Sequence, residues 1–278
     1  MFLKNLIKIL PVGSARIYAL TFAGMVRLSV VSYLNTTPFL YGIKHSGFLN
    51  SADYELSLDN PASCADKLLS GKADIGLIPV AVLPLLSHYN IIGNTCIGAN
   101  GKVDSVLLMS EVPLNRIKTI YLDYQSRTSV NLCRILASKL WKIDVEFVNA
   151  PEDFLDHISG NTAAVVIGDR ALDLREKFPF TYDLSEGWKD LTGLPFVFAA
   201  WVSVNNTGAE YAPRLEAALQ WGIDHSREAA KAISGSYPLH YHVDTYLTQR
   251  ISYTLDEAKR KALETFLFML SKLTDSGN

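Results

Sequence analysis

The chain contains an internal repeat, in which residues 54–83 correspond to residues 143–172 at a constant offset of 89. The first copy reads YELSLDNPASCADKLLSGKADIGLIPVAVL and the second reads IDVEFVNAPEDFLDHISGNTAAVVIGDRAL. Identical residues are few, but Ser70-Gly71 coincides with Ser159-Gly160. Each copy predicts a short strand, a helix ended by glycine, and a second strand. The repeat therefore constrains the chain to two similar α/β units.

A strand and a polar loop that begins a helix precede each copy. In the first half, the apolar residues 26–31 lead into residues 32–38 (SYLNTTP), where Thr37 is the expected N-cap and Pro38 the first helical residue. In the second half, residues 117–122 lead into residues 124–129 (YQSRTS). The backbone N–H groups at such helix starts favour a carboxylate or a phosphate. The alternative is that the Asn and Thr side chains of the first loop only cap the helix.

The order of elements predicts a two-lobed α/β fold with mostly parallel sheets and a cleft between the lobes. Ligands of open α/β sheets bind beyond the carboxyl ends of the strands, so both polar loops should face this cleft. We expect residues 1–24 to be an N-terminal extension, residues 25–110 and 202–278 to form lobe 1, and residues 111–201 to form lobe 2.

The last third of the chain is expected to return to lobe 1. Residues 194–204 form an apolar run that predicts a long buried strand. Residues 212–233 are amphipathic, and Thr254-Leu255-Asp256-Glu257 reads as a capping box that begins a helix through Leu273.

Composition and charge exclude several classes of protein. In a chain of 278 residues, 49% hydrophobic residues can fill a large core, and 19% charged residues is low for a disordered protein. A net charge of −2 and a pI near 6.3 provide no basic surface for nucleic acid. No apolar run approaches the ~20 residues that span a membrane. Lys4 and Lys8 are followed by Pro11 and Gly13 before a continuous apolar stretch forms, so a signal peptide fits poorly.

Met1 and Met25 are both candidate translation starts. The three cysteines, which have no zinc-binding spacing, are predicted to be buried free thiols in a reducing, cytoplasmic compartment. His240 and His242 could share one face of a strand, but no acidic or cysteine partner has suitable spacing, so neither a metal nor a cofactor is predicted. A homodimer is one assembly that the sequence leaves open. The cysteines are Cys64, Cys96 and Cys133.

Five motifs together resemble chorismate dehydratase of the futalosine route to menaquinone, from about Met25 to the C-terminus. They are residues 32–36 (SYLNT), 71–80 (GKADIGLIPV), 104–108 (DSVLL), 126–129 (SRTS) and the segment from Gly187-Trp188 to Trp201. The resemblance implies a fold like that of type II periplasmic binding proteins. It also implies loss of water from chorismate to give 3-[(1-carboxyvinyl)oxy]benzoate, without a cofactor. The related 1,4-dihydroxy-6-naphthoate synthase shares the fold, but its usual opening motif is not seen in this sequence.

The resemblance places Asn35 and Ser105 against the substrate as catalytic residues. Asp123 and Asp169 follow strands of the second half and are competing candidates for the base, whereas a carboxylate of the substrate is the alternative base. A solute-binding protein for a small dicarboxylate remains the competing function, because the fold does not decide between them. The predicted substrate-binding residues are Ser32, Thr36, Ser126, Arg127, Thr128, Ser129 and Asp169.

Overall fold

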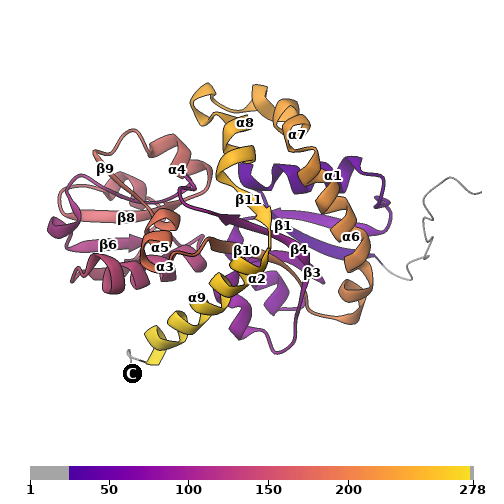
Figure 1. The fold of residues 1–278 in the computed structure, drawn as a ribbon, viewed down its shortest axis with the longest axis horizontal. Coiled ribbons are helices and arrows are strands. Elements are labelled where there is room, and N and C mark those ends of the chain that lie inside the picture. The colour runs from indigo at the N-terminus through magenta and orange to yellow at the C-terminus, as the bar shows by residue number, and fades with distance from the viewer. Residues whose placement is uncertain (1–24, 276–278) are drawn as a thin grey trace, which may run out of the picture.

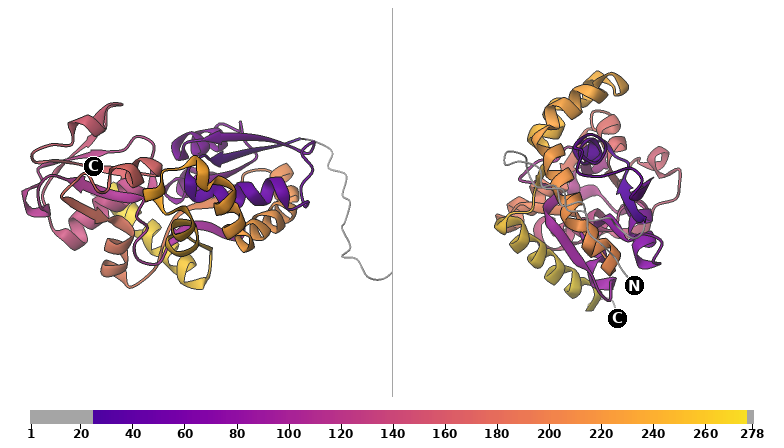
Figure 2. Two further views of the ribbon diagram at one scale, coloured as in Figure 1. Left: turned by 90° about the horizontal axis from the view of Figure 1, so that it is seen from above. Right: turned by 90° about the vertical axis from the view of Figure 1, so that its right-hand side faces the viewer.

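The computed structural model describes residues 25–275, which form two lobes side by side, each built on one β-sheet (Figure 1). The predicted extension, residues 1–24, lies outside the described residues. Seen from above, the lobes lie along the long axis of the molecule (Figure 2). In residues 25–275, no helix combines the length and the apolar character needed to cross a membrane.

The first sheet has six strands in the order β2-β1-β3-β10-β4-β11. β1 runs parallel to β2 and β3, whereas β10 runs antiparallel to β3 and β4, and β11 runs antiparallel to β4. The register places Leu28 of β1 opposite Leu56 of β2 and Ile75 of β3. The strands are β1 (Val26–Val31), β2 (Tyr54–Asp59), β3 (Ile75–Pro79), β4 (Asn90–Ala99), β10 (Phe196–Ser203) and β11 (Ser252–Thr254).

The second sheet has five strands in the order β7-β6-β8-β5-β9. β6 runs parallel to β7 and β8, whereas β5 runs antiparallel to β8 and β9. The strands are β5 (Val106–Ser110), β6 (Thr119–Leu122), β7 (Glu146–Asn149), β8 (Thr162–Ile167) and β9 (Phe180–Asp183).

The predicted repeat is confirmed by the topology, because β2-β1-β3 and β7-β6-β8 are equivalent parallel triplets. Gly71 and Gly160 end the connections with positive φ angles of 68° and 57°, as the repeat predicted. The predicted helix is present in the first copy as α2 (Pro61–Leu69), but the second copy has only the 3₁₀ turn Phe154–His157 in its place. The expectation of mostly parallel sheets is wrong. A strand from outside the triplet runs antiparallel to β3 in one sheet and to β8 in the other, so both sheets are mixed.

The lobe boundaries differ from those expected at residues 110 and 202. β5 pairs within the second sheet and β10 pairs within the first sheet. The chain therefore changes sheets between Ala99 and Val106, and returns between Thr192 and Phe196. The buried strand predicted over residues 194–204 is β10, which lies within the first sheet.

Nine α-helices of residues 25–275 cover the sheets (Figure 1). They are α1 (Thr37–His45), α2 (Pro61–Leu69), α3 (Thr128–Leu136), α4 (Asp169–Leu174), α5 (Leu184–Thr192), α6 (Asn206–Asp224), α7 (Ser226–Ile233), α8 (Val243–Thr245) and α9 (Glu257–Asp275). Shorter 3₁₀ turns are Leu34–Thr36, Val80–Leu85, Leu114–Arg116, Phe154–His157, Ser234–Ser236 and Leu239–Tyr241, and π turns are Ala137–Trp141 and Tyr246–Arg250.

Local capping explains where several helices begin. The Asn60 side chain accepts a hydrogen bond from Ser63 N at 2.9 Å and caps α2. The predicted capping box at Thr254 is shifted, because β11 continues through Thr254 and Asp256 instead accepts from Lys259 N at 2.8 Å. The expected helix over residues 212–233 is broken at His225 into α6 and α7.

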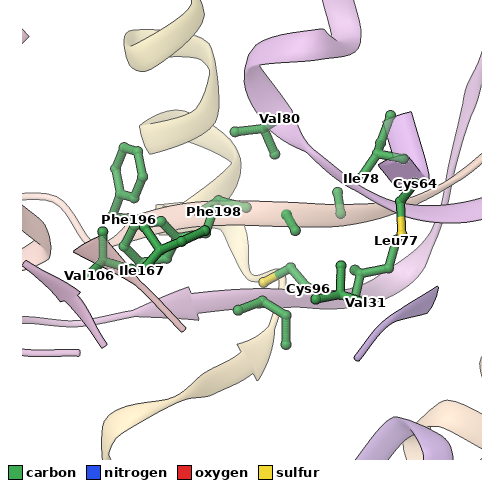
Figure 3. Packing of buried hydrophobic residues seen from close by; sticks show 14 of the residues in the cluster. Val31, Cys64, Leu77, Ile78, Val80, Cys96, Val106, Ile167, Phe196 and Phe198 are labelled. Carbon is green, nitrogen blue, oxygen red and sulfur yellow. The ribbon is translucent and has the colours of Figure 1, made fainter. Parts of the chain in front are cut away.

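The hydrophobic core continues from one lobe into the other. Figure 3 shows Val106 and Ile167 of the second lobe beside Phe196 and Phe198 of β10. The ring of Phe266 in α9 lies 5.2 Å from that of Phe196, so the C-terminal helix covers the return crossover. The three cysteines are buried free thiols, as predicted.

Candidate active site

A cavity lies between the lobes at the carboxyl ends of strands from both sheets. Its lining includes Val31 and Pro79, which end β1 and β3, and Ile167, which ends β8. The space between its walls and at its mouth measures about 540 Å³. This position agrees with the rule that open α/β sheets bind ligands beyond their strand ends.

The cavity brings together five of the predicted site residues. Asn35 comes from the 3₁₀ turn after β1, and Ser105 from the crossover directly before β5. Ser126, Thr128 and Ser129 come from the start of α3. The remaining walls are largely apolar, so neutral hydrogen-bonding groups are concentrated at two helix starts and one crossover.

Four of the predicted residues lie outside the cavity lining, namely Ser32, Thr36, Arg127 and Asp169. Ser32 is exposed and donates to the Asp59 carbonyl at 3.3 Å. Thr36 is buried and its hydroxyl is bonded to the Val31 carbonyl at 2.7 Å, which holds the turn. Arg127 pairs with Asp66 of lobe 1 at 2.8 Å, so its guanidinium joins the lobes beside the cavity.

The Asp169 carboxylate lies at the start of the first helix, where the sequence predicted that a ligand anion would bind. Its carboxylate accepts a hydrogen bond from Leu34 N at 3.0 Å, although it belongs to α4 of the other lobe. Burial raises the pKa of Asp169, against the effect of this hydrogen bond. The helix also begins earlier than expected: the chain is already in a 3₁₀ turn at Leu34, so Thr37 is the first α-helical residue and not the N-cap.

Tyr33 and Gly168 bring the lobes together at one edge of the cavity. Gly168 has a φ angle of 66°, and a Cβ atom there would lie 2.8 Å from the Tyr33 ring. Only glycine therefore fits this close approach without strain. The Tyr33 hydroxyl is hydrogen-bonded to the Gln125 side chain across the lobes.

Two tyrosines that the sequence analysis missed hold the candidate catalytic residues from behind. The Tyr246 hydroxyl donates to Ser105 Oγ at 2.7 Å, and the Tyr253 hydroxyl donates to the Asn35 carbonyl at 2.9 Å. Both tyrosines are buried. No motif surrounds either residue, so local sequence offered no signal for them.

The cavity is lined almost entirely by side chains that do not ionise. Among its lining residues in the described chain, Tyr33 is the only side chain that titrates, and burial raises its pKa well above the usual range. Asp123 is 1% exposed and pairs with Arg170 at 2.6 Å, outside the lining. Burial raises the pKa of Asp123 against the opposing charge of Arg170. The cavity can therefore orient and polarise a ligand, but its lining offers no base at neutral pH.

Comparison with known proteins identifies the family. The sequence profile of a family described as menaquinone biosynthesis matches residues 26–272. The chain belongs to this family. A chorismate dehydratase of Thermus thermophilus is 27% identical to this chain in an alignment of 263 residues that covers 86% of this chain and 93% of that protein.

Solved structures confirm the fold that the sequence predicted for this chain. An Archaeoglobus fulgidus protein superposes with a TM-score of 0.70 at 16% identity, covering 90% of this chain and 98% of that one. The alkanesulfonate-binding protein of Xanthomonas axonopodis superposes with a TM-score of 0.61 at 14% identity, covering 87% and 90%. A Candida albicans protein described as having the generic periplasmic binding protein fold gives 0.61 at 11% identity, covering 89% and 90%. The fold is therefore the two-lobed α/β architecture of periplasmic binding proteins.

Proposed function

We propose that this protein is a chorismate dehydratase, a carbon–oxygen lyase that converts chorismate to 3-[(1-carboxyvinyl)oxy]benzoate. The family and the Thermus thermophilus relative support this choice. The observation that carries it furthest is the convergence of Asn35, Ser105 and the start of α3 on one interlobe cavity. These are the polar segments that resemble the family.

The start of α3 is the proposed site for one carboxylate of the substrate. Thr128 and Ser129 line the cavity at the first turn of this helix, where backbone N–H groups and the helix dipole favour an anion. Ser129 N is held by Ser126 Oγ at 3.0 Å, which fixes the geometry of the turn. The second carboxylate would lie toward Asn35 and Ser105 on the opposite wall.

The proposed reaction draws its base from the substrate. The enolpyruvyl carboxylate removes the proton from the adjacent ring carbon, those electrons form the new ring double bond, and the ring hydroxyl leaves and becomes water with that proton. The aromatic product supplies the driving force. A correctly oriented intramolecular group reaches an effective molarity on the order of 10⁵ M or more, so orientation by the protein is the main requirement. Asn35 and Ser105 would hold the carboxylate and the departing hydroxyl.

The decisive experiment is incubation of the purified protein with chorismate, with chromatographic detection of the aromatic product and a protein-free control for spontaneous decay. We expect stoichiometric conversion with loss of one water. Tight binding of chorismate without conversion would instead favour a solute-binding protein. If the protein neither binds nor converts chorismate, chorismate is rejected as the substrate.

A further inference from the structure

We infer that Tyr246 is a positioning residue that directs the Ser105 hydroxyl into the cavity. The inference rests on the proposed function, because it concerns what Ser105 offers the substrate. Tyr246 lies outside the cavity lining and would act only through the residues that it contacts.

The hydrogen bond between the two hydroxyls determines where the serine proton points. Tyr246 and Ser105 are only 3% and 1% exposed, and their hydroxyl oxygens are 2.7 Å apart. Burial raises the pKa of Tyr246 well above the usual range, so its hydroxyl remains a donor at all ordinary pH values. A serine hydroxyl has one proton and two lone pairs. Because the tyrosine fills one lone pair, the serine proton is left to a ligand in the cavity.

The same turn also fixes the backbone on which Ser105 lies. Tyr246 begins the π turn Tyr246–Arg250, and Arg250 Nε donates to Asp104 at 2.6 Å. Asp104 has a φ angle of 64°, a conformation that is costly for a residue other than glycine. One π turn therefore holds two consecutive residues of the crossover, and such turns are frequent at functional sites.

Further contacts leave little freedom for Ser105 except its hydroxyl torsion. Gly168 N donates to the Ser105 carbonyl at 2.9 Å from the opposite side. Asp183 accepts from the amides of Val103 and Asp104 at 2.9 and 2.8 Å. These contacts hold the crossover backbone without the Tyr246 hydroxyl, so the contribution that remains for this hydroxyl is the direction of the serine proton.

Tyr246 also lies beside the second candidate catalytic residue. A hydrogen bond with the Asn35 side chain acts to lower the pKa of Tyr246, whereas burial has the larger effect and raises it. Asn35 Oδ1 is buried and has no hydrogen-bond partner within residues 25–275. The tyrosine hydroxyl therefore lies next to both groups that would hold the substrate, and leaves an acceptor on Asn35 and a donor on Ser105 for the ligand.

The first test is Tyr246→Phe, which removes the hydroxyl and keeps the ring. We expect kcat for chorismate to fall roughly tenfold while KM changes less than about twofold, because the loss affects orientation more than binding. Tyr182→Phe is the matched control, since Tyr182 Oη accepts a hydrogen bond from the Leu114 amide at 3.1 Å, within lobe 2. Equal effects of the two substitutions on kcat would overturn the inference.

A double-mutant cycle with Ser105→Ala shows whether Tyr246 acts through the serine. We expect Tyr246→Phe to have no further effect on kcat in the Ser105→Ala background. Full additivity would show that Tyr246 contributes by another route. If the wild-type protein fails to convert chorismate, the proposed function fails first, whereas an active wild type with an additive cycle overturns only this inference.

A fluorinated tyrosine at position 246 provides a readout that does not depend on removing the side chain. Such a residue keeps the ring and the hydroxyl but ionises at a lower pH. We expect kcat to match the wild type at low pH and to decline on the alkaline side, where the wild type remains active. An unchanged pH profile, although the fluorinated residue is seen spectroscopically to ionise within the measured range, would contradict the role of the hydroxyl as the donor.

Discussion

Asp169 shows how one residue changes the interpretation of a binding loop. Its carboxylate satisfies the Leu34 amide, so the start of the first helix already has an anion. Within the described residues, no carboxylate accepts a hydrogen bond from the first turn of α3. A substrate carboxylate should therefore bind at α3 and not at the Leu34 turn.

Replacing both Thr128 and Ser129 by Ala tests the proposed anion site. We expect KM for chorismate to rise at least about tenfold, since two charge-assisted hydrogen bonds of ~1.5–3 kcal/mol each would be weakened. Thr192→Ala is the control, because its hydroxyl donates to the Trp188 carbonyl at 2.8 Å, outside the cavity lining. An unchanged KM with a normal circular dichroism spectrum would remove this turn from the site.

The choice of base can be decided by substituting single side chains. If the substrate supplies the base, Asn35→Ala or Ser105→Ala should lower kcat about 10²-fold, the scale of losing one stabilising donor. Asp123→Asn and Asp169→Asn should each lower it only modestly, because neither residue lines the cavity. Abolished turnover with normal chorismate binding in either Asp variant would show that the protein provides the base.

Among the elements, β3 is anchored by a buried carboxylate at its start. Asp74 is 4% exposed and accepts from Arg27 N at 2.9 Å, from Arg27 Nη2 at 2.7 Å and from Asn205 Nδ2 at 2.7 Å. It thus joins β3 to β1 and to the start of α6. Burial acts to raise the pKa of Asp74, but the hydrogen bonds from Arg27 and Asn205 outweigh it and the pKa is lowered.

Asp74→Asn should lower the free energy of unfolding by about 2 kcal/mol at neutral pH, measured by urea denaturation. A lowered pKa in the folded state means that this stabilisation is present above the unfolded pKa of about 3.9 and is lost as the pH falls through the folded value. The difference between wild type and variant should therefore be constant from about pH 5 to 8 and shrink below about pH 4. Asp190→Asn, at an exposed position of α5, serves as the control. A difference that grows as the pH falls would contradict this assignment.

At the scale of the whole molecule, the lobes are joined by contacts that would have to break for a ligand to enter. They include the Tyr33–Gln125 and Leu34–Asp169 hydrogen bonds and the Asp66–Arg127 ion pair. Such contacts, together with crossovers between Ala99 and Val106 and between Thr192 and Phe196, suit hinge closure around a ligand. The two crossovers are therefore the expected hinges.

Small-angle X-ray scattering can measure this closure. We expect the radius of gyration of the free protein to be larger than that of the complex with a substrate analogue, because closure excludes water from the cavity. Asp66→Asn, which removes an exposed interlobe ion pair, should leave the compact liganded form unchanged. Identical profiles with and without the analogue would mean that the lobes do not move.

The sequence by itself determined the repeated unit and the two loops of the cavity. Strand periodicity, the Asn60 cap and the glycines at 71 and 160 act over a few residues, so the matching strand orders of the two lobes followed from local pattern. The same local signals indicated Asn35 and Ser126 near the strand ends, where they line the cavity.

Only the tertiary structure decided which distant residues meet. Ser105 and Tyr246 are separated by 141 residues, and Leu34 and Asp169 by 135. The antiparallel pairing of β10 with β3 likewise depends on where the chain returns to the first lobe. No local propensity encodes such contacts, because their free energy comes from burial and hydrogen bonding between segments that approach only when both lobes have formed.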